Sequence, residues 1–571
     1  MFYFIPDWIS ARLYETDTEI KAVLVNEIDK EFIILEDNSA KLWKVALENE
    51  NKFDAKIIAN KLKKPEFEVK KFLINLENIR IVQQLNTSKE YVDTKFSINS
   101  NENTADRYTS GNYNEPVPGG SNLDEEYSFM DWVEANGFLY STTWELTYRC
   151  NERCIHCFNP GASHVEGDKS FRKVKETDFE KIIKVLDDFK SIGVFRIMIT
   201  GGELFIRKDI FKIIEEIKKR RFSLTIFTNG TLLEDNEIDK LANYYPSRIE
   251  LSLYSHKPEA HDKITRLKGS WEKTVKTALK IKKKNIDTFV KMIVTKDTVQ
   301  DVEGFEKFCK NNDFDFAVDF NMSAGVDGNQ FPIKNLLADS KELILQCFNK
   351  SSPLYIGELS NSRKYDAKKL KGQHVCGAGR NLMSISAEGN VSPCNSLPLE
   401  CGNINSEKLS DIWKQSSIGK KEKNNAVYSK KKSESSNNSE KLSSWQGVRR
   451  GDYEVCGNFE RCNWCQKCPG LAYLETGSEL KPSTTNCRNS AARMIAFDLL
   501  KKFKTKKNII KNFNLDSLKR NYKKETALWN PSENMKSNRL KNFKSVILKR
   551  TKPSALEKLI AKEGLNNIDQ M

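Results

Sequence analysis

Three closely spaced cysteines are the residues best suited to chemistry in this 571-residue chain. Cys150, Cys154 and Cys157 have the spacing CxxxCxxC within residues 144–158 (WELTYRCNERCIHCF), directly after a strand-like run. Four thiolates normally hold an iron–sulfur cluster, so three on one loop can hold a 4Fe-4S cluster and leave one iron open to an outside ligand. Structural zinc is the alternative, although zinc favours closed tetrahedral sites.

A second motif follows at residues 197–203 (IMITGGE), where an apolar strand ends in two glycines and an acid. Glycine lets backbone approach a ligand closely because it has no Cβ atom. A CxxxCxxC motif after one strand and GGE after the next resembles the radical S-adenosylmethionine (SAM) superfamily, whose members bind SAM at the open iron.

This resemblance assigns roles to individual residues. It implies that the three cysteines hold the SAM-binding 4Fe-4S cluster and that His156 packs near the adenine, although the ring would serve equally to cap the loop. It also implies that Ser252 contacts the ribose, where a local hydrogen bond is the alternative. The amino group of SAM would meet the backbone of Gly201 and Gly202 and the carboxylate of Glu203, a charge-assisted contact. Leu204 stands where the family usually has proline.

Seven cysteines near the C-terminal end form a second constellation. Together with the segments CGAGR, ISAEGNVSPC and CGNI they resemble a SPASM domain, the auxiliary-cluster domain of radical SAM enzymes that act on peptides and proteins. The resemblance implies two auxiliary 4Fe-4S clusters, and a zinc ribbon is the alternative. The cysteines concerned are Cys376, Cys394, Cys456, Cys462, Cys465, Cys468 and Cys487.

The assignment of these cysteines to clusters stays open, because the spacing Cx5CxxCxxC departs from the usual SPASM spacing. Chain order groups Cys456, Cys462, Cys465 and Cys487 and leaves the other three on a cluster with an open iron. A ferredoxin-like arrangement instead places Cys462, Cys465 and Cys468 on one cluster. Cys309 and Cys347 lie in apolar helical patterns and are expected in the core. Cys401 either completes an auxiliary cluster or remains a thiol.

The N-terminal 85 residues predict a separate small domain. Strands are expected at 22–28 and 31–35, followed by helices at 41–47, 55–62 and 67–76. This order resembles the PqqD-like winged-helix domain, which binds leader peptides of ribosomally made, modified peptides. The resemblance implies that a leader adds as a strand, with contacts near residues 32–35 and 67–72. A DNA-binding winged helix is the alternative, but the third helix has mixed charge, so nucleic acid is not the expected partner.

Six strand-like runs, each before a helical one, predict parallel strands with crossover helices. Their number matches the partial (β/α)6 TIM-like barrel of the radical SAM superfamily, so we expect an α/β fold with this barrel at its centre. The runs lie at residues 142–147, 195–200, 223–228, 248–253, 288–294 and 316–320. The predicted domains are a winged helix at 1–85, a disordered linker at 86–130, the barrel at 135–340, a SPASM domain at 370–490 with a low-complexity insertion at 420–444, and a basic extension at 500–571.

Composition limits the class of protein. With 39% hydrophobic and 30% charged residues the chain reads as a globular protein of several domains. No membrane span or export signal is expected, so the thirteen cysteines are predicted to stay reduced in the cytoplasm, with ten of them in metal-binding clusters. The net charge of +15 lies mostly in the tail, where residues 501–571 hold nineteen Lys and Arg against six Asp and Glu. Such a tail is typical of a solvated extension.

The resemblance implies a peptide maturase that cleaves SAM and acts on a ribosomal precursor peptide through a 5′-deoxyadenosyl radical. Two auxiliary clusters favour thioether crosslinks from Cys sulfur to carbon, with carbon–carbon crosslinking and epimerisation as alternatives. The expected partners are the precursor peptide, its leader bound by the N-terminal domain, and an electron donor such as flavodoxin or ferredoxin. An alternative from another class is a redox-responsive DNA-binding regulator, which would bind DNA in a salt-sensitive manner.

Overall fold

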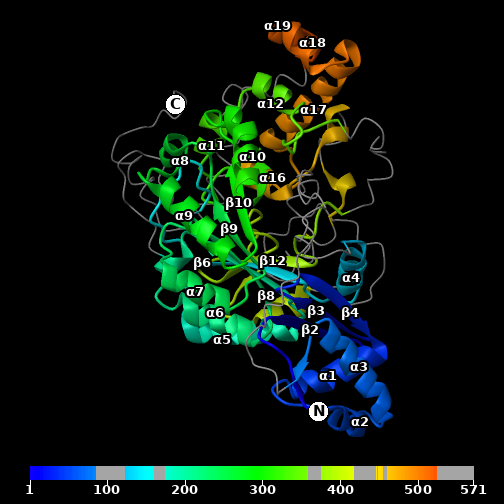
Figure 1. Cartoon of the computed structure of the whole chain (residues 1–571). Coiled ribbons are helices and arrows are strands. Elements are labelled where there is room, and N and C mark those ends of the chain that lie inside the picture. The colour runs from blue at the N-terminus through cyan, green and yellow to red at the C-terminus, as the bar shows by residue number, and fades with distance from the viewer. Residues whose placement is uncertain are drawn as a thin grey trace.

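The computed structural model describes residues 1–84, 123–159, 174–357, 374–416, 445, 448–453 and 460–523. The N-terminal domain lies at one end of the molecule and the last helices at the other, with the large sheet between them (Figure 1). Most of the predicted linker, the low-complexity insertion, Cys456 and the end of the basic extension lie outside the described residues.

The N-terminal domain combines a small antiparallel sheet with three helices. The sheet has the order β2-β3-β4, and a separate pair is formed by β1 and β5. The two predicted strands and three predicted helices are confirmed, but β2 was missed, although Ile9, Ala11 and Leu13 alternate with polar residues. The bounds are β1 Tyr3–Phe4, β2 Ile9–Glu15, β3 Ile20–Asn26, β4 Glu31–Glu36, α1 Asp37–Glu48, α2 Ala55–Leu62, α3 Glu66–Asn78 and β5 Gln83–Gln84.

Helix α4 (Leu123–Ala135) joins this domain to the barrel and begins inside the range predicted as linker. Phe129 and Val133 pack against Tyr14, Val23 and Val25 of the small sheet, and Tyr140 and Phe195 complete the same apolar cluster. One face of the small sheet is therefore buried against α4 and the barrel, because its alternating apolar residues need such a cover.

The barrel contains the six predicted strands as parallel neighbours, in the order β11-β10-β9-β8-β7-β6, and the predicted α/β fold is confirmed. Amphipathic helices cover it; α5, for example, buries Ile182, Val185 and Phe189 and begins at the N-cap Asp178. The bounds are β6 Ser141–Thr147, α5 Phe179–Ser191, β7 Arg196–Gly201, α6 Ile210–Lys219, β8 Ser223–Thr228, α7 Asp235–Asn243, β9 Arg248–Ser252, α8 Pro258–Thr265, α9 Ser270–Lys283, β10 Thr288–Ile293, α10 Val302–Asn311, β11 Asp315–Asp319, α11 Phe331–Asn335 and α12 Ser340–Gln346.

The cysteine-rich C-terminal part continues the same sheet. Strand β12 pairs with β6 in parallel, and a hairpin then adds β13 and β14 in antiparallel order. The barrel and this part therefore share one nine-stranded sheet. The bounds are β12 Leu382–Ile385, β13 Asn390–Ser392, β14 Gly402–Asn403, α14 Leu409–Ser416, α16 Pro469–Thr476, α17 Thr484–Phe503, α18 Lys506–Lys511 and α19 Leu515–Asn521.

The N-terminal domain docks at the end of the barrel where the parallel strands begin. Arg12 donates from Nε to the carbonyl of Val194 at 2.6 Å and lies 4.3 Å above the ring of Phe222. Arg221 reaches the other way and donates to the carbonyls of Ile5, Pro6 and Ile9. Lys30 adds a hydrogen bond to the carbonyl of Ser247 at 2.6 Å.

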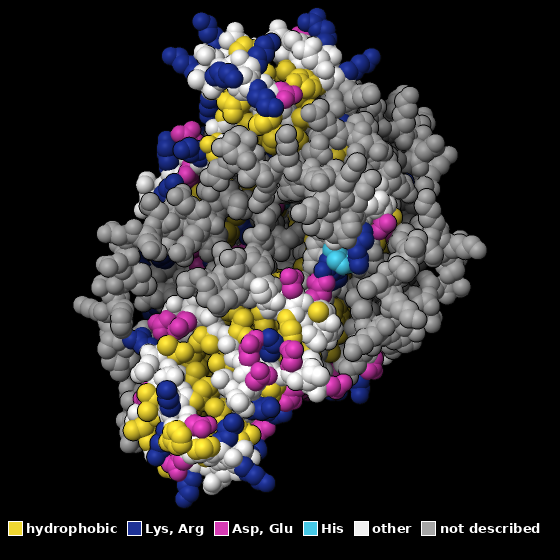
Figure 2. Space-filling model, turned by 90° about the vertical axis from the view of Figure 1, so that its right-hand side faces the viewer, with side chains coloured by type: hydrophobic (Ala, Val, Ile, Leu, Met, Phe, Trp, Pro, Cys, Tyr) yellow, Lys and Arg dark blue, Asp and Glu magenta, His cyan; other side chains and the backbone are white. Residues whose placement is uncertain are grey.

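The two ends of the molecule differ in surface charge. Lys and Arg side chains gather around the C-terminal helices, while the N-terminal domain carries both signs of charge (Figure 2). In the described part of the chain, no helix is both long enough and apolar enough to cross a membrane.

Candidate functional site

The cysteine loop follows β6 at the edge of the sheet where the parallel strands end. Cys150, Cys154 and Cys157 are all half-buried thiols. The loop is fixed to the end of α8, because the N–H of Arg153 donates to Thr265 and that of Ile155 to Ile264, each at 2.9 Å. The N–H of Cys157 also donates to the carbonyl of Cys154, at 3.1 Å. The backbone therefore holds the three cysteines in one tight turn.

The chemistry of this donor set fits an iron–sulfur cluster. Burial raises the pKa of Cys150 to about 12 and that of Cys157 to about 11, and the charged thiolates of Cys150 and Cys157 would both raise the pKa of Cys154. A bound cation is therefore needed to keep these thiols deprotonated. Thiolates are soft ligands, which suit the iron of iron–sulfur clusters. Within the described segments, no three or more His, Cys, Asp or Glu side chains already form a metal-binding group. Ligation by these cysteines stays a prediction.

The glycines of the GGE motif admit the cysteine loop itself. A Cβ atom on Gly201, whose φ is +144°, would lie 2.1 Å from the carbonyl oxygen of Thr147, and one on Gly202 would lie 2.2 Å from that of Arg149. The N–H groups of Gly202 and Glu203 donate to these same two oxygens at 2.8 Å. The close approach that glycine allows is therefore used here by the chain leading to Cys150, and contact with SAM stays a prediction.

Glu203 joins the ends of β7 and β8. Its fully buried carboxylate accepts hydrogen bonds from Thr228 Oγ1 at 2.8 and 2.9 Å and from the N–H of Asn229 at 2.8 Å. Asn229 in turn donates from Nδ2 to Asn151 at 2.9 Å. The acid thereby positions a side chain that contacts the cysteine loop, and its predicted contact with SAM remains untested.

His156 and Ser252 meet at a tyrosine that sequence reasoning missed. The ring of His156 packs edge-on against Tyr254 with 4.5 Å between centroids, and His261 stacks on Tyr254 at 5.5 Å. Ser252 hydrogen-bonds the same tyrosine. Both predicted SAM-contacting residues thus contact Tyr254, and each of these contacts is local.

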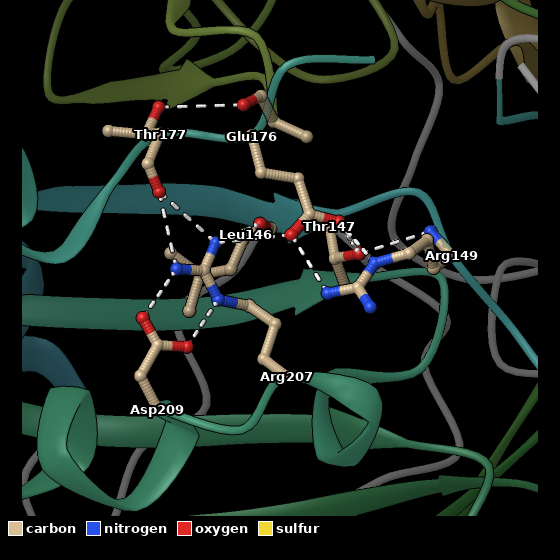
Figure 3. Close-up of polar contacts among 8 residues, drawn as sticks. Leu146, Thr147, Arg149, Glu176, Thr177, Arg207 and Asp209 are labelled. Carbon is tan, nitrogen blue, oxygen red and sulfur yellow. Dashed lines mark hydrogen bonds and ion pairs between the residues drawn. The ribbon is translucent and has the colours of Figure 1, made fainter. Parts of the chain in front are cut away.

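Arg207, four residues after Glu203, ties the end of β6 to the start of α5 (Figure 3). Its buried guanidinium donates to the carbonyl of Leu146 at 2.8 Å, to that of Thr177 and to the Asp209 carboxylate at 2.8 Å. Burial works to raise the pKa of Asp209, but the hydrogen bonds from Arg207 lower it overall. This arginine supports the strand end that leads into the cysteine loop.

Arg149 and Thr147 meet Glu176 beside this arginine (Figure 3). Arg149 donates to both Glu176 oxygens, at 2.8 and 2.9 Å, and the Thr147 hydroxyl donates to the same carboxylate. Arg149 directly precedes Cys150 and Thr147 lies three residues before it, so this pair of contacts also holds the start of the loop.

Glu145 on β6 is a buried acid between the two groups of cysteines. Tyr148 donates to its Oε2 atom at 2.8 Å. Burial raises the pKa of Glu145 to about 7. Its charge acts on the thiols of both Cys157 and Cys394, which places it near the cysteine loop and the C-terminal cysteines. The strand pattern gave no reason to expect an acid with two cysteine neighbours.

Three C-terminal cysteines, Cys376, Cys394 and Cys468, come together from separate loops. The N–H of Gly379 donates to the carbonyl of Pro393 at 3.1 Å, and a Cβ atom on Gly470 would lie 2.5 Å from the carbonyl oxygen of Ser396. The three loops therefore pack on one another. Each thiol lies close enough to act electrostatically on another of the three.

A second set gathers at the start of α17. Cys465 hydrogen-bonds Ser490, which lies one helical turn after Cys487, and Cys462 acts electrostatically on Cys465. The short helix η5 (Glu460–Trp464), which carries Cys462, packs on α17. These groupings agree with the partition by chain order, which stays a proposal because Cys456 lies outside the described residues.

The remaining cysteines pack in the core. Cys309 and Cys347 are fully buried in the main apolar cluster, which confirms their expected role. Cys401 belongs to the same cluster, and its thiol donates to the carbonyl of Leu399 at 3.1 Å.

Comparison with known proteins identifies both cysteine regions. Residues 144–309 match the Radical SAM superfamily and residues 376–469 match SPASM, an iron–sulfur cluster-binding domain. The AdoMet-dependent heme synthase of Methanosarcina barkeri is 24% identical over 49% of this chain and 83% of its own length. The subtilosin biosynthesis protein AlbA of Bacillus subtilis is 27% identical over 48% of this chain and 58% of its own length.

Among solved structures, Streptococcus suis SuiB bound to the precursor peptide SuiA aligns with 72% of this chain and 88% of SuiB, at 18% identity and a TM-score of 0.44. The two matching domains imply a 4Fe-4S cluster that binds SAM, auxiliary iron–sulfur clusters and SAM itself. The chain thus contains a radical SAM domain followed by a SPASM domain, and it is a radical SAM enzyme.

Proposed function

We propose that this enzyme modifies a ribosomally synthesised precursor peptide and forms thioether crosslinks between a cysteine sulfur and a carbon atom of another residue. The name of the relative AlbA, a bacteriocin biosynthesis protein, supports a peptide substrate. The heme synthase relative represents a different substrate class, so the proposal depends on features of this chain.

The observation that carries the proposal is the group formed by Cys376, Cys394 and Cys468. Three loops pack together around these thiols, and the thiol of Cys401 donates a hydrogen bond to the carbonyl of Leu399. Three cysteine ligands would leave one iron of an auxiliary cluster open. A substrate thiol is the ligand such an iron would accept, because soft thiolates suit iron–sulfur clusters.

When bound, SAM and its cluster supply a radical that removes a hydrogen atom from the peptide. The residues of the chain position these groups. Cys150, Cys154 and Cys157 would hold the SAM cluster, with Arg207 and Glu176 supporting the loop that carries them. Cys456, Cys462, Cys465 and Cys487 would hold the second auxiliary cluster.

The N-terminal domain is proposed to bind the leader of the precursor as an added strand. Strand β4 lies at the edge of its sheet, and an edge strand offers backbone groups for pairing. On α3, Phe67 and Ile74 are 71% and 49% exposed, so they are available for apolar side chains of a leader. An electron donor such as flavodoxin or ferredoxin is the second proposed partner.

Anaerobic reconstitution with iron and sulfide tests the radical chemistry. Dithionite and SAM should yield 5′-deoxyadenosine, and Cys150→Ala, Cys154→Ala and Cys157→Ala should each abolish it. Cys309→Ala serves as the control, because this thiol lies in the core. A wild-type enzyme with intact clusters and no 5′-deoxyadenosine would refute the proposal.

Coexpression with short cysteine-containing peptides tests the product. Each thioether should lower the peptide mass by two hydrogen atoms and protect one cysteine from alkylation. A mass loss without protection would indicate carbon–carbon crosslinks, and an unchanged mass with altered stereochemistry would indicate epimerisation.

A further inference from the structure

A strongly basic surface lies at the end of α17 and on the two short helices that follow it, α18 and α19 (Figure 2). Residues 501–523 contain nine Lys and Arg against a single Asp. All nine basic side chains are exposed, and together they are called the basic patch below. One carboxylate cannot neutralise nine cations, so the patch presents a positive potential to an approaching molecule.

The basic patch begins beside the second set of auxiliary cysteines. Trp464 directly precedes Cys465, and its ring lies 5.0 Å from that of Phe497 on α17. The ammonium group of Lys501 lies 4.1 Å above the same Phe497 ring. Arg493 holds Trp464 in place by donating to its carbonyl at 3.2 Å. A single pair of half-buried aromatic rings therefore separates the basic patch from the proposed second auxiliary cluster.

The exposed face of the patch is polar, which argues against insertion into a membrane. Ile509 on α18 and Leu518 on α19 are both buried against the protein. Ile510, which is 52% exposed, is the one large apolar side chain exposed within residues 501–523. An amphipathic helix that lies in a membrane surface needs its apolar face free to enter the lipid. The patch is therefore suited to attract a partner by charge.

The charge and the position of the patch together fit a redox partner. Cleavage of SAM consumes one electron, and the protein that brings it has to come close to a metal centre. Electron-transfer proteins form small, weak complexes, and steering by charge speeds their encounter. A nucleic acid would also be attracted by the charge, but it has no use for the neighbouring cysteines.

We propose that the basic patch is the docking site of an acidic, low-potential electron-transfer protein of the flavodoxin class. This inference rests on the electron donor named in the proposed function and adds where it binds. In the complex the anionic flavin hydroquinone of the donor is oxidised to the neutral semiquinone, and one 4Fe-4S cluster of the enzyme is reduced. One electron moves, and no proton is transferred and no bond is made or broken in this step.

Electron delivery by a purified acidic flavodoxin tests the patch. The reconstituted holoenzyme is mixed anaerobically with SAM and a limiting amount of flavodoxin hydroquinone, and the initial rate of 5′-deoxyadenosine formation is measured. The test variant reverses four charges of the patch: Lys501→Glu, Lys507→Glu, Lys511→Glu and Arg520→Glu. Its rate should fall about tenfold or more, because steering charges act on association. With dithionite it should match the wild type, since a small reductant needs no docking site.

The matched control reverses four exposed lysines on α6 and α9, which lie far from α18 and α19 (Figure 1). These substitutions are Lys212→Glu, Lys273→Glu, Lys276→Glu and Lys283→Glu. The net charge changes by the same amount, so the control separates local docking from the overall field of the protein, and its rate with flavodoxin should stay within about twofold of the wild type. Raising the salt concentration from about 50 to about 300 mM should remove most of the difference between the patch variant and the wild type.

Zero-length crosslinking locates the complex without SAM cleavage. A carbodiimide joins carboxylates of flavodoxin to lysines that they contact, and peptide mass spectrometry identifies these lysines. Crosslinks of the wild type should include residues 501–523 and should disappear at about 300 mM salt. If the patch variant loses iron or unfolds, the crosslinks and the salt dependence of the wild type decide the question.

The proposal is overturned if the patch variant accepts electrons from flavodoxin like the wild type, if the control variant falls equally, or if every crosslink lies outside residues 501–523. It is also overturned if the patch retains duplex DNA or phosphatidylglycerol vesicles and no flavodoxin. A failure of the proposed function gives a different result. Flavodoxin would then crosslink to the patch, but neither flavodoxin nor dithionite would yield 5′-deoxyadenosine.

Discussion

Arg12 and Arg221 cross the interface between the N-terminal domain and the barrel in opposite directions, and each ends on backbone carbonyls of the other domain. Both guanidinium groups are buried. Burial lowers the pKa of Arg12 to about 10, so the group stays charged at neutral pH. Arg12 and Arg221 together hold the N-terminal domain against the end of the barrel where the parallel strands begin.

Arg221→Met should destabilise the docked domain by about 3 kcal/mol, because several buried carbonyls lose their donor. Thermal unfolding of the holoenzyme should show an earlier transition. Arg220→Met is the control, since its partners Asp187 and Glu216 lie on the surface, and it should cost under about 1 kcal/mol. Equal losses in the two variants would contradict the interlocked interface.

The position of the N-terminal domain on the barrel predicts a minimum number of residues between the leader and the modified cysteine of the precursor peptide. The N-terminal domain contacts the beginnings of β7 and β8, while the cysteine loop follows the end of β6. A strand of this length spans about 20 Å, or about six extended residues. Deleting residues between leader and modified cysteine should leave leader affinity unchanged but abolish modification once fewer than about six remain. Mass spectrometry of a deletion series checks this, and modification that is independent of spacer length would contradict it.

Arg207→Lys should weaken cluster retention although it keeps the charge. Lysine cannot reproduce the planar fork that reaches Leu146, Thr177 and Asp209 together. A loss of about 1–3 kcal/mol is expected from the unpaired carbonyls. Iron content after gel filtration should fall, whereas Arg149→Lys, at the half-exposed ion pair with Glu176, should lose little. Unchanged iron content in Arg207→Lys would rule out this supporting role.

Paired cysteine substitutions test the proposed partition. Cys394→Ala should remove one auxiliary cluster, about four iron atoms per chain. Adding Cys468→Ala should remove no more iron, while adding Cys487→Ala should remove about four more. A ferredoxin-like arrangement predicts the reverse for Cys468. Cys401→Ala should leave the iron content unchanged, because this thiol packs in the core.

Glu145 should make stability depend on pH. Its pKa is about 7 in the folded protein against 4.5 ordinarily, so between these values the folded protein holds a proton that the unfolded chain has released. The contribution of Glu145 to stability is therefore greatest below about pH 4.5 and declines by about 3 kcal/mol as the pH rises through 7. Glu145→Gln should flatten this part of the unfolding profile. If the variant keeps the slope of the wild type, the pH dependence of stability arises from another titratable group.

The barrel strands were predictable because each is a short apolar run followed by a helical pattern, a local signal. The pairing of β12 with β6 was not, since it joins residues more than two hundred positions apart and has no local signature. Arg207 and Glu145 were missed for the same reason: each acts through neighbours supplied by other elements.

The glycines of the GGE motif have a structural role that their sequence pattern did not reveal. Gly201 and Gly202 were expected to make room for a ligand, and the structure gives that room to the chain before Cys150. Sequence reasoning recognised the need for close approach. It could not tell which atoms approach.

The shared backbone ladder between β6 and β12 has a consequence for electron transfer. The cysteine loop follows β6 and Cys376 precedes β12, and these two strands are hydrogen-bonded to each other. Their metal centres would therefore keep a constant tunnelling distance while substrate enters and product leaves.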